Sequence, residues 1–179
     1  MTKARNFDPD RSWAPLDERL SKETDPRRRA VLQQVRDHMC TEISGDFDGL
    51  MATLTNEPRY HFWGLPIEGG PKGREAVSAF YRQMIDGGGH RFHFDIERIV
   101  VDDDTVVTEG KIHQKTSVEA LRASGIEEVD GEPLDDDATY IAETHIVTVW
   151  PMDADGRIIG EDIYFGSPPM ANLRRLQKS

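Results

Sequence analysis

Apolar residues recur at helical spacing through the first half of the chain. Asp25-Pro26 predicts a helix start, because a capping residue precedes a proline suited to the first turn. The apolar stripe of this helix is formed by Val31, Leu32, Val35, Met39 and Ile43, with His38 at its edge. Asp46 is placed to cap a second helix, and residues 69–84 predict a third. Before the third helix, the short aromatic segment Arg59–Gly64 predicts a strand.

The second half alternates with period two, which is typical of strands. Residues 91–101 and 105–116 predict a hairpin around an acidic turn, and residues 139–150 and 157–165 predict another. Residues 118–138 are mixed and acidic, which indicates an excursion outside the core, and residues 1–25 are polar without a sustained period. We therefore expect an N-terminal arm over residues 1–25, followed by a single α+β domain over residues 26–179. In this domain a curved antiparallel sheet packs on three helices and forms a cone with an apolar interior.

Composition narrows the range of partners. The formal charge of −11 over 179 residues argues against nucleic acid and anionic membranes, since both select basic surfaces. The single cysteine, Cys40, cannot form an internal disulfide, which is typical of a reducing compartment. The sequence shows neither the apolar core of a signal peptide nor an apolar run long enough to span a bilayer. A cytoplasmic protein is expected.

Histidine and tyrosine side chains are the first candidates for chemistry at the cone. His38 would titrate near neutrality and act as an acid, a base or a hydrogen-bond donor, or it is a histidine at the edge of the core. Tyr60 is either a phenol donor or a packing residue. Glu109, Lys111 and His113 share one strand face, because alternate residues point the same way. Facing inward they would mark a functional site, and facing outward they would be solvated.

The direction of His145 is open for the same reason, because either Thr144-Ile146-Thr148 or His145-Val147-Val149 can face inward. His90, His93 and Glu97 invite a metal interpretation. However, residues three apart on a strand point to opposite faces, so no shared metal ion is expected there. We expect no metal and no cofactor.

Several motifs together resemble the nuclear transport factor 2-like superfamily, particularly its SnoaL-like and ketosteroid isomerase-like branches. They are SGDFDGLMATL, RYHFWG, PKGREAVSAFYRQMIDGGG, IVVDDDTVVTEG and DGRIIGEDIYFG, and the resemblance covers residues 30–166. The resemblance implies the cone-shaped fold and a homodimer formed through the open face of the sheet. Members of this superfamily include isomerases, dehydratases, epoxide hydrolases, polyketide cyclases and proteins with no chemistry, so the fold does not set the function.

The resemblance also implies roles for individual residues. The tyrosine donor of ketosteroid isomerase-like proteins lies eight residues before the aspartate matched by Asp46, which gives His38. Their carboxylate base matches His61 or Phe62, and their second donor matches His145. The resemblance to limonene epoxide hydrolase-like proteins implies that Tyr60 takes the place of their tyrosine. It also implies that Glu109 and Lys111 take the places of their two charged residues, with the order of the charges reversed. The expected catalytic residues are His38, Tyr60, Glu109 and His145, and the expected ligand contacts are His61, Phe62, Trp63, Lys111 and His113.

Two functions follow from these expectations. The first is an isomerase, dehydratase or cyclase that acts without a cofactor on a small apolar oxygenated molecule, such as a steroid, terpenoid or polyketide fragment. The second is a non-catalytic member that binds an apolar ligand or serves as a dimeric interaction module. The absence of a carboxylate from RYHFWG keeps the second function open.

Overall fold

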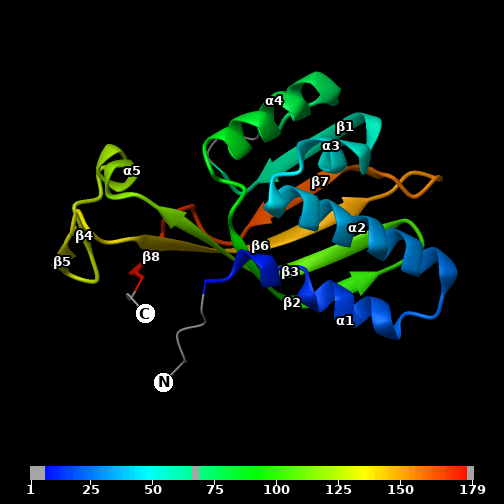
Figure 1. Cartoon of the computed structure of the whole chain (residues 1–179), viewed down its shortest axis with the longest axis horizontal. Coiled ribbons are helices and arrows are strands. Elements are labelled where there is room, and N and C mark those ends of the chain that lie inside the picture. The colour runs from blue at the N-terminus through cyan, green and yellow to red at the C-terminus, as the bar shows by residue number, and fades with distance from the viewer. Residues whose placement is uncertain (1–6, 66–68, 177–179) are drawn as a thin grey trace.

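The computed structural model describes residues 7–65 and 69–176, and Figure 1 shows helices gathered on one face of a curved sheet. The helices are the short 3-10 helix η1 (Pro9–Arg11), α1 (Ala14–Lys22), α2 (Pro26–Ser44), α3 (Phe47–Ala52), α4 (Gly73–Asp86) and α5 (Val118–Ala123). The strands are β1 (Leu54–Trp63), β2 (His93–Val101), β3 (Thr105–Thr116), β4 (Glu128–Val129), β5 (Glu132–Pro133), β6 (Tyr140–Pro151), β7 (Ile158–Phe165) and β8 (Asn172–Arg175). This architecture confirms the predicted α+β fold class.

Helix α2 starts where its sequence predicts, and a glycine ends it. The side chain of Asp25 accepts hydrogen bonds from the backbone N–H groups of Arg27 and Arg28, which satisfies two donors that the first turn leaves free. At the other end Gly45 takes a left-handed φ of 76°, a conformation that costs glycine little. The helix therefore has a fixed length and register, and it presents its apolar stripe and His38 to the sheet.

The main sheet has the strand order β1-β7-β6-β3-β2, and β8 pairs with the far end of β6. Its neighbours are antiparallel except β1 and β7, which run parallel with Tyr60 opposite Glu161. The pairing register shifts between Ile96 and Arg98 on β2, opposite Gly110 on β3. A β-bulge of this kind bends the sheet, and the bend curls its inner face toward the helices.

The core fills the space between this inner face and the helices. Val106, Ile146, Trp150 and Ile158 from the sheet are buried with the apolar stripe of α2. A second and smaller cluster, which includes Leu121, Val129 and Tyr140, is built by the excursion between β3 and β6. Figure 1 shows α5, β4 and β5 at one end of the molecule, away from the main helices.

The N-terminal region contains more structure than the sequence predicts. Helix α1 lies within the segment expected to be an arm, and it buries Leu16 and Leu20 against the core. Two apolar residues are too few to show a helical period among so many charges, so the pattern gave no signal. The rest of the predicted arm, residues 1–6, lies outside the residues that the structure describes. No helix within residues 7–65 and 69–176 is long and apolar enough to cross a membrane.

Candidate functional site

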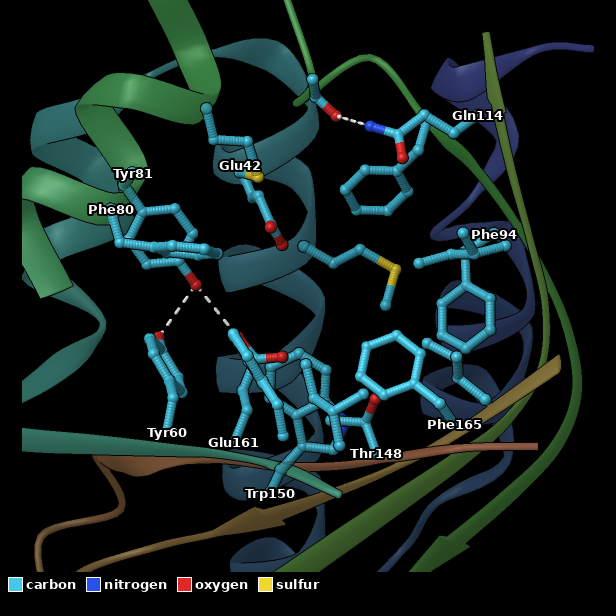
Figure 2. A pocket seen from close by; sticks show the side chains of 18 of the residues that line it. Glu42, Tyr60, Phe80, Tyr81, Phe94, Gln114, Thr148, Trp150, Glu161 and Phe165 are labelled. Atoms are coloured by element: carbon cyan, nitrogen blue, oxygen red, sulfur yellow. Dashed lines mark hydrogen bonds between the residues drawn. The ribbon is translucent and has the colours of Figure 1, made fainter. Parts of the chain in front are cut away.

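A cavity of about 280 Å³ lies between helices α2 and α4 and the inner face of the sheet. Its walls are mainly aromatic and include Phe62, Phe80, Phe92, Phe94, Trp150 and Phe165. Figure 2 shows these rings around the open space, with most of the oxygen atoms gathered toward one end. An apolar cavity with a few convergent polar groups is the usual form of a small-molecule site.

Tyr81 on α4 organises that polar end. Its hydroxyl lies 2.8 Å from the hydroxyl of Tyr60 and donates to Oε1 of Glu161 over 3.0 Å. Both tyrosines are buried, and burial together with the nearby charge of Glu161 raises their pKa values well above the usual range. The two phenols therefore keep their protons and act as hydrogen-bond donors.

His38 lies directly behind Tyr81, and its side chain is fully buried. Its Nε2 is 3.1 Å from the Tyr81 hydroxyl and 3.3 Å from Oε1 of Glu161. Its Nδ1 is 2.7 Å from Oγ1 of Thr53. Because the Thr53 hydroxyl donates its own proton to the carbonyl of Leu50, Nδ1 must be the donor in the contact with Thr53. In the neutral imidazole this leaves a lone pair on Nε2, which faces Tyr81 and Glu161.

Glu42 is a second acidic side chain at the same end. It lies one helical turn after His38 on α2 and is 9% exposed. Figure 2 shows its carboxyl group directed into the cavity, and no hydrogen bond joins that carboxyl to another residue in the described ranges. Burial, and then the charge of Glu161, raises the pKa of Glu42 well above its usual range, which favours the protonated carboxyl.

Three of the expected site residues belong to this region. Tyr60 and Phe62 line the cavity, and His38 contacts the groups that line it. They meet because β1 directs alternate residues inward while α2 crosses the same face of the sheet. His61 and Trp63 alternate with them and lie on the other side of β1, where His61 Nδ1 is 2.6 Å from Oδ1 of Asp162.

The expected residues of β3 and β6 need correction, since Glu109, Lys111, His113 and His145 do not line this cavity. Strand β3 turns Thr108, Gly110 and Ile112 inward, and β6 turns Ile146, Thr148 and Trp150 inward, so the intervening residues point away.

On the outer face these residues contact charged side chains of neighbouring strands. Glu109 contacts Arg98 over 2.7 Å, and His145 lies 3.4 Å from Glu109. Lys111 bonds to Glu143 over 2.9 Å. The alternation of residues left two orientations open, with these side chains facing inward or outward. The structure places all four on the outer face.

Sequence reasoning missed Glu42, Tyr81 and Glu161. Tyr81 lies at helical spacing from Val77 and Met84 on α4, which is the pattern of a packing residue, although its hydroxyl is the centre of the polar end. Glu42 follows His38 by four residues, and this helical spacing was a usable signal for two polar groups on one face. Glu161 gave no local signal, because it meets Tyr60 only through the parallel pairing of strands about 100 residues apart in sequence.

His38, Glu42 and Glu161 also form a set of possible metal ligands. One ligand atom from each residue lies within 4.8 Å of the other two. Imidazole nitrogen and carboxylate oxygen are the donors that zinc and related ions take in proteins. These residues differ from His90, His93 and Glu97, the set excluded above from the strand geometry.

A family model for the SnoaL-like domain matches residues 35–160. The chain belongs to the SnoaL-like family. No protein with a curated function matches this chain.

Solved structures of low sequence identity share the fold. A putative SnoaL-like polyketide cyclase from Jannaschia sp. CCS1 is 18% identical with a TM-score of 0.57, and the match covers 80% of this chain and 90% of the other. Bal32a from a soil-derived mobile gene cassette is 20% identical with a TM-score of 0.55, covering 79% and 92%. An LEH-like epoxide hydrolase from M. tuberculosis is also 20% identical with a TM-score of 0.55, covering 81% and 89%.

Proposed function

We propose that this SnoaL-like protein binds a small apolar oxygenated molecule, such as a steroid, terpenoid or polyketide-like compound, and acts on it as an isomerase, dehydratase or cyclase. The observation that carries the proposal is the buried carboxyl of Glu161, held by Tyr81 at one end of an aromatic cavity. The polyketide cyclase and the epoxide hydrolase among the structural neighbours are consistent with this class of chemistry.

The proposed chemistry uses the two phenols and the carboxylate together. An oxygen of the bound molecule would accept a hydrogen bond from Tyr60 or Tyr81, which stabilises negative charge that develops on it. Glu161 would take a proton from a neighbouring carbon or hydroxyl, and return it to another atom of the same molecule. Side chains alone supply these steps, and a positioned general base of this kind contributes about 10²–10⁴-fold to a rate.

Ligand binding is the first test. Steroids and polyketide-like ketones added to the purified protein should raise its melting temperature, because a molecule that binds only the folded state stabilises it. Apolar ketones small enough for a cavity of about 280 Å³ are the first choice. If no compound from any of these classes raises the melting temperature, the proposed ligand class is rejected.

Catalysis is then separated from binding by Glu161→Gln. The amide keeps the size of the side chain and cannot accept a proton as the carboxylate does, so turnover should fall at least about 100-fold while ligand affinity largely survives. Glu143→Gln, on the outer face of the sheet, is the matched control and should leave both unchanged. Equal turnover by the Glu161→Gln variant would remove Glu161 from the mechanism.

The second candidate is a ligand-binding protein without catalysis, and one observation favours it. Phe62 lines the cavity at a place where the resemblance implies a carboxylate base. In that case ligands raise the melting temperature of wild type and Glu161→Gln alike, and no product forms from any of them.

A homodimer is also proposed, formed through the outer face of the sheet. Val100 and Tyr164 are large apolar residues on this face and are 54% and 47% exposed. Burial of such residues against a second copy removes apolar surface from water. Light scattering should give twice the chain mass, and Tyr164→Arg should shift the population toward monomer.

A cytoplasmic location stays a prediction.

A further inference from the structure

We propose that His38, Glu42 and Glu161 bind one divalent first-row transition-metal ion at the polar end of the cavity. The inference concerns the affinity of this cluster for an ion, and it does not depend on the reaction proposed above.

The spacing of the ligand atoms fits an ion. Metal–ligand bonds of about 2.1 Å place neighbouring ligand atoms about 3.0–3.4 Å apart in octahedral and tetrahedral sites. Nε2 of His38 and Oε1 of Glu161 are 3.3 Å apart. The Glu42 oxygen lies within 4.8 Å of both atoms, so it would have to move toward them to reach the same ion.

The surroundings of two of these ligands resemble the outer shell of a metal site. A histidine that binds a metal usually donates its other ring N–H to a fixed acceptor, and a ligating carboxylate is itself hydrogen-bonded. Nδ1 of His38 donates to Thr53, which leaves the Nε2 lone pair directed toward Glu161. Tyr81 donates to Glu161 in turn. Both ligands are therefore oriented before any ion arrives.

Glu42 provides an independent reason for a cation. Its carboxyl is about nine-tenths buried, is directed into the cavity, and forms no hydrogen bond within the described parts of the chain. A buried carboxyl without a partner is costly, and it faces a second carboxyl on Glu161. The described lining of the cavity includes no lysine or arginine to balance them. A divalent cation would displace the proton of Glu42, balance the two carboxylates and give Glu42 a bond.

The donor set selects the class of ion. One imidazole and two carboxylates suit Zn²⁺, Fe²⁺, Mn²⁺ or Co²⁺, whereas Ca²⁺ takes six to eight oxygen ligands and Mg²⁺ keeps several waters. Glu42 and Glu161 line the cavity while His38 lies behind them, so the open side of the ion would face the space in which a ligand binds. Because a ligated Glu161 cannot accept a proton, Zn²⁺ should inhibit the reaction proposed above.

Equilibrium dialysis of the whole chain tests the proposal. Protein stripped with a chelator is dialysed against Zn²⁺, and the bound metal is measured by elemental mass spectrometry. We expect one Zn²⁺ per chain, retained in excess Mg²⁺. Thr53→Val, which removes the acceptor of His38 without touching the ion, should weaken binding about 10- to 100-fold.

Ligand variants and a matched control identify the site. Glu42→Gln and Glu161→Gln should each weaken Zn²⁺ binding at least about tenfold. Glu143→Gln is the control, because it removes a carboxylate that lies 3.6 Å from His113 on the outer face and should leave binding unchanged. Glu42→Gln removes no side-chain hydrogen bond among the residues that the structure describes, so we expect this variant to fold even if Glu161→Gln is unstable.

Either of two results would exclude the metal site. In the first, the wild-type protein retains no stoichiometric Zn²⁺. In the second, the Glu42→Gln variant retains Zn²⁺ as well as the wild type does. Loss of retained Zn²⁺ in excess Mg²⁺ excludes the transition-metal class. None of these results bears on ligand binding or turnover by the metal-free protein, so the proposed function is judged separately.

Discussion

The hydroxyl of Tyr81 holds the polar end of the cavity together, and its removal gives a quantitative test of this arrangement. In Tyr81→Phe the ring remains and only the hydroxyl is lost, so the packing of α4 against β1 is preserved. The lost contacts are those to Tyr60 at 2.8 Å, to Glu161 at 3.0 Å and to His38 at 3.1 Å. All four side chains are buried, so their hydrogen bonds are largely shielded from bulk solvent.

The size of the effect follows from the kind of each bond. A neutral buried hydrogen bond contributes about 1 kcal/mol, and one to a charged group contributes about 1.5–3 kcal/mol. Tyr81 has one proton, which goes to Glu161, so the bonds that count are one charged bond to Glu161 and one neutral bond to Tyr60. Together they give a loss of about 2–4 kcal/mol for Tyr81→Phe. Tyr60→Phe loses a single neutral bond and should cost about 1 kcal/mol. Since a domain of this kind has a free energy of unfolding of about 5–15 kcal/mol, Tyr81→Phe should be clearly destabilised yet remain folded.

Urea unfolding followed by circular dichroism and tryptophan fluorescence gives the two free energies of unfolding, provided that the two probes coincide. The double variant Tyr60→Phe/Tyr81→Phe completes a cycle. It should be less destabilised than the sum of the single changes by about 1 kcal/mol, because the bond between the two phenols is lost in either single variant. A Tyr81→Phe variant no less stable than Tyr60→Phe would show that Tyr81 is not the centre of the network.

Two further predictions concern the sheet. Burial lowers the pKa of His113 to about 4, against the opposing charge of Glu143, with His93 close by. Between pH 6.5 and about 4 the unfolded chain binds this proton and the folded chain does not, so up to about 3 kcal/mol of stability is present above pH 6.5 and is lost as the pH falls toward 4. Urea midpoints across this range should fall more steeply for wild type than for His113→Phe, and equal slopes would contradict the assignment. A Cβ on Gly110 would lie 2.1 Å from the carbonyl oxygen of Asp95, so Gly110→Ala should lower the free energy of unfolding by at least about 2 kcal/mol, and an unchanged urea midpoint would contradict this.

The fold was predictable where local chemistry decides it. The Asp25-Pro26 pair and Gly45 set the ends of α2, and β3 spans the predicted residues Thr105–Thr116. Period-two alternation finds strands of this kind reliably, because one face of each is buried. Alternation alone could not say which face of β3 looks inward, since Val107 on one face and Ile112 on the other are both apolar.

The polar end of the cavity was beyond prediction for a different reason. Glu161 points at Tyr81 because β7 pairs in parallel with β1, with Tyr60 opposite Glu161. The sequence predicted β7 only as half of a hairpin with β6, and nothing in a hairpin specifies a parallel neighbour on its other side.

The parallel pairing of β1 and β7 also explains why residues next to each other on one strand lie on different faces of the sheet. On β1 and β7 the pleat sends Tyr60 and Glu161 into the cavity, and it sends His61 and Asp162 to the opposite face, where they meet over 2.6 Å. A shift of one residue in this register would exchange the two pairs, because side chains alternate strictly along a strand. The chemistry of the cavity therefore depends on strand register as much as on residue type. A disturbed register should weaken ligand binding before it unfolds the protein.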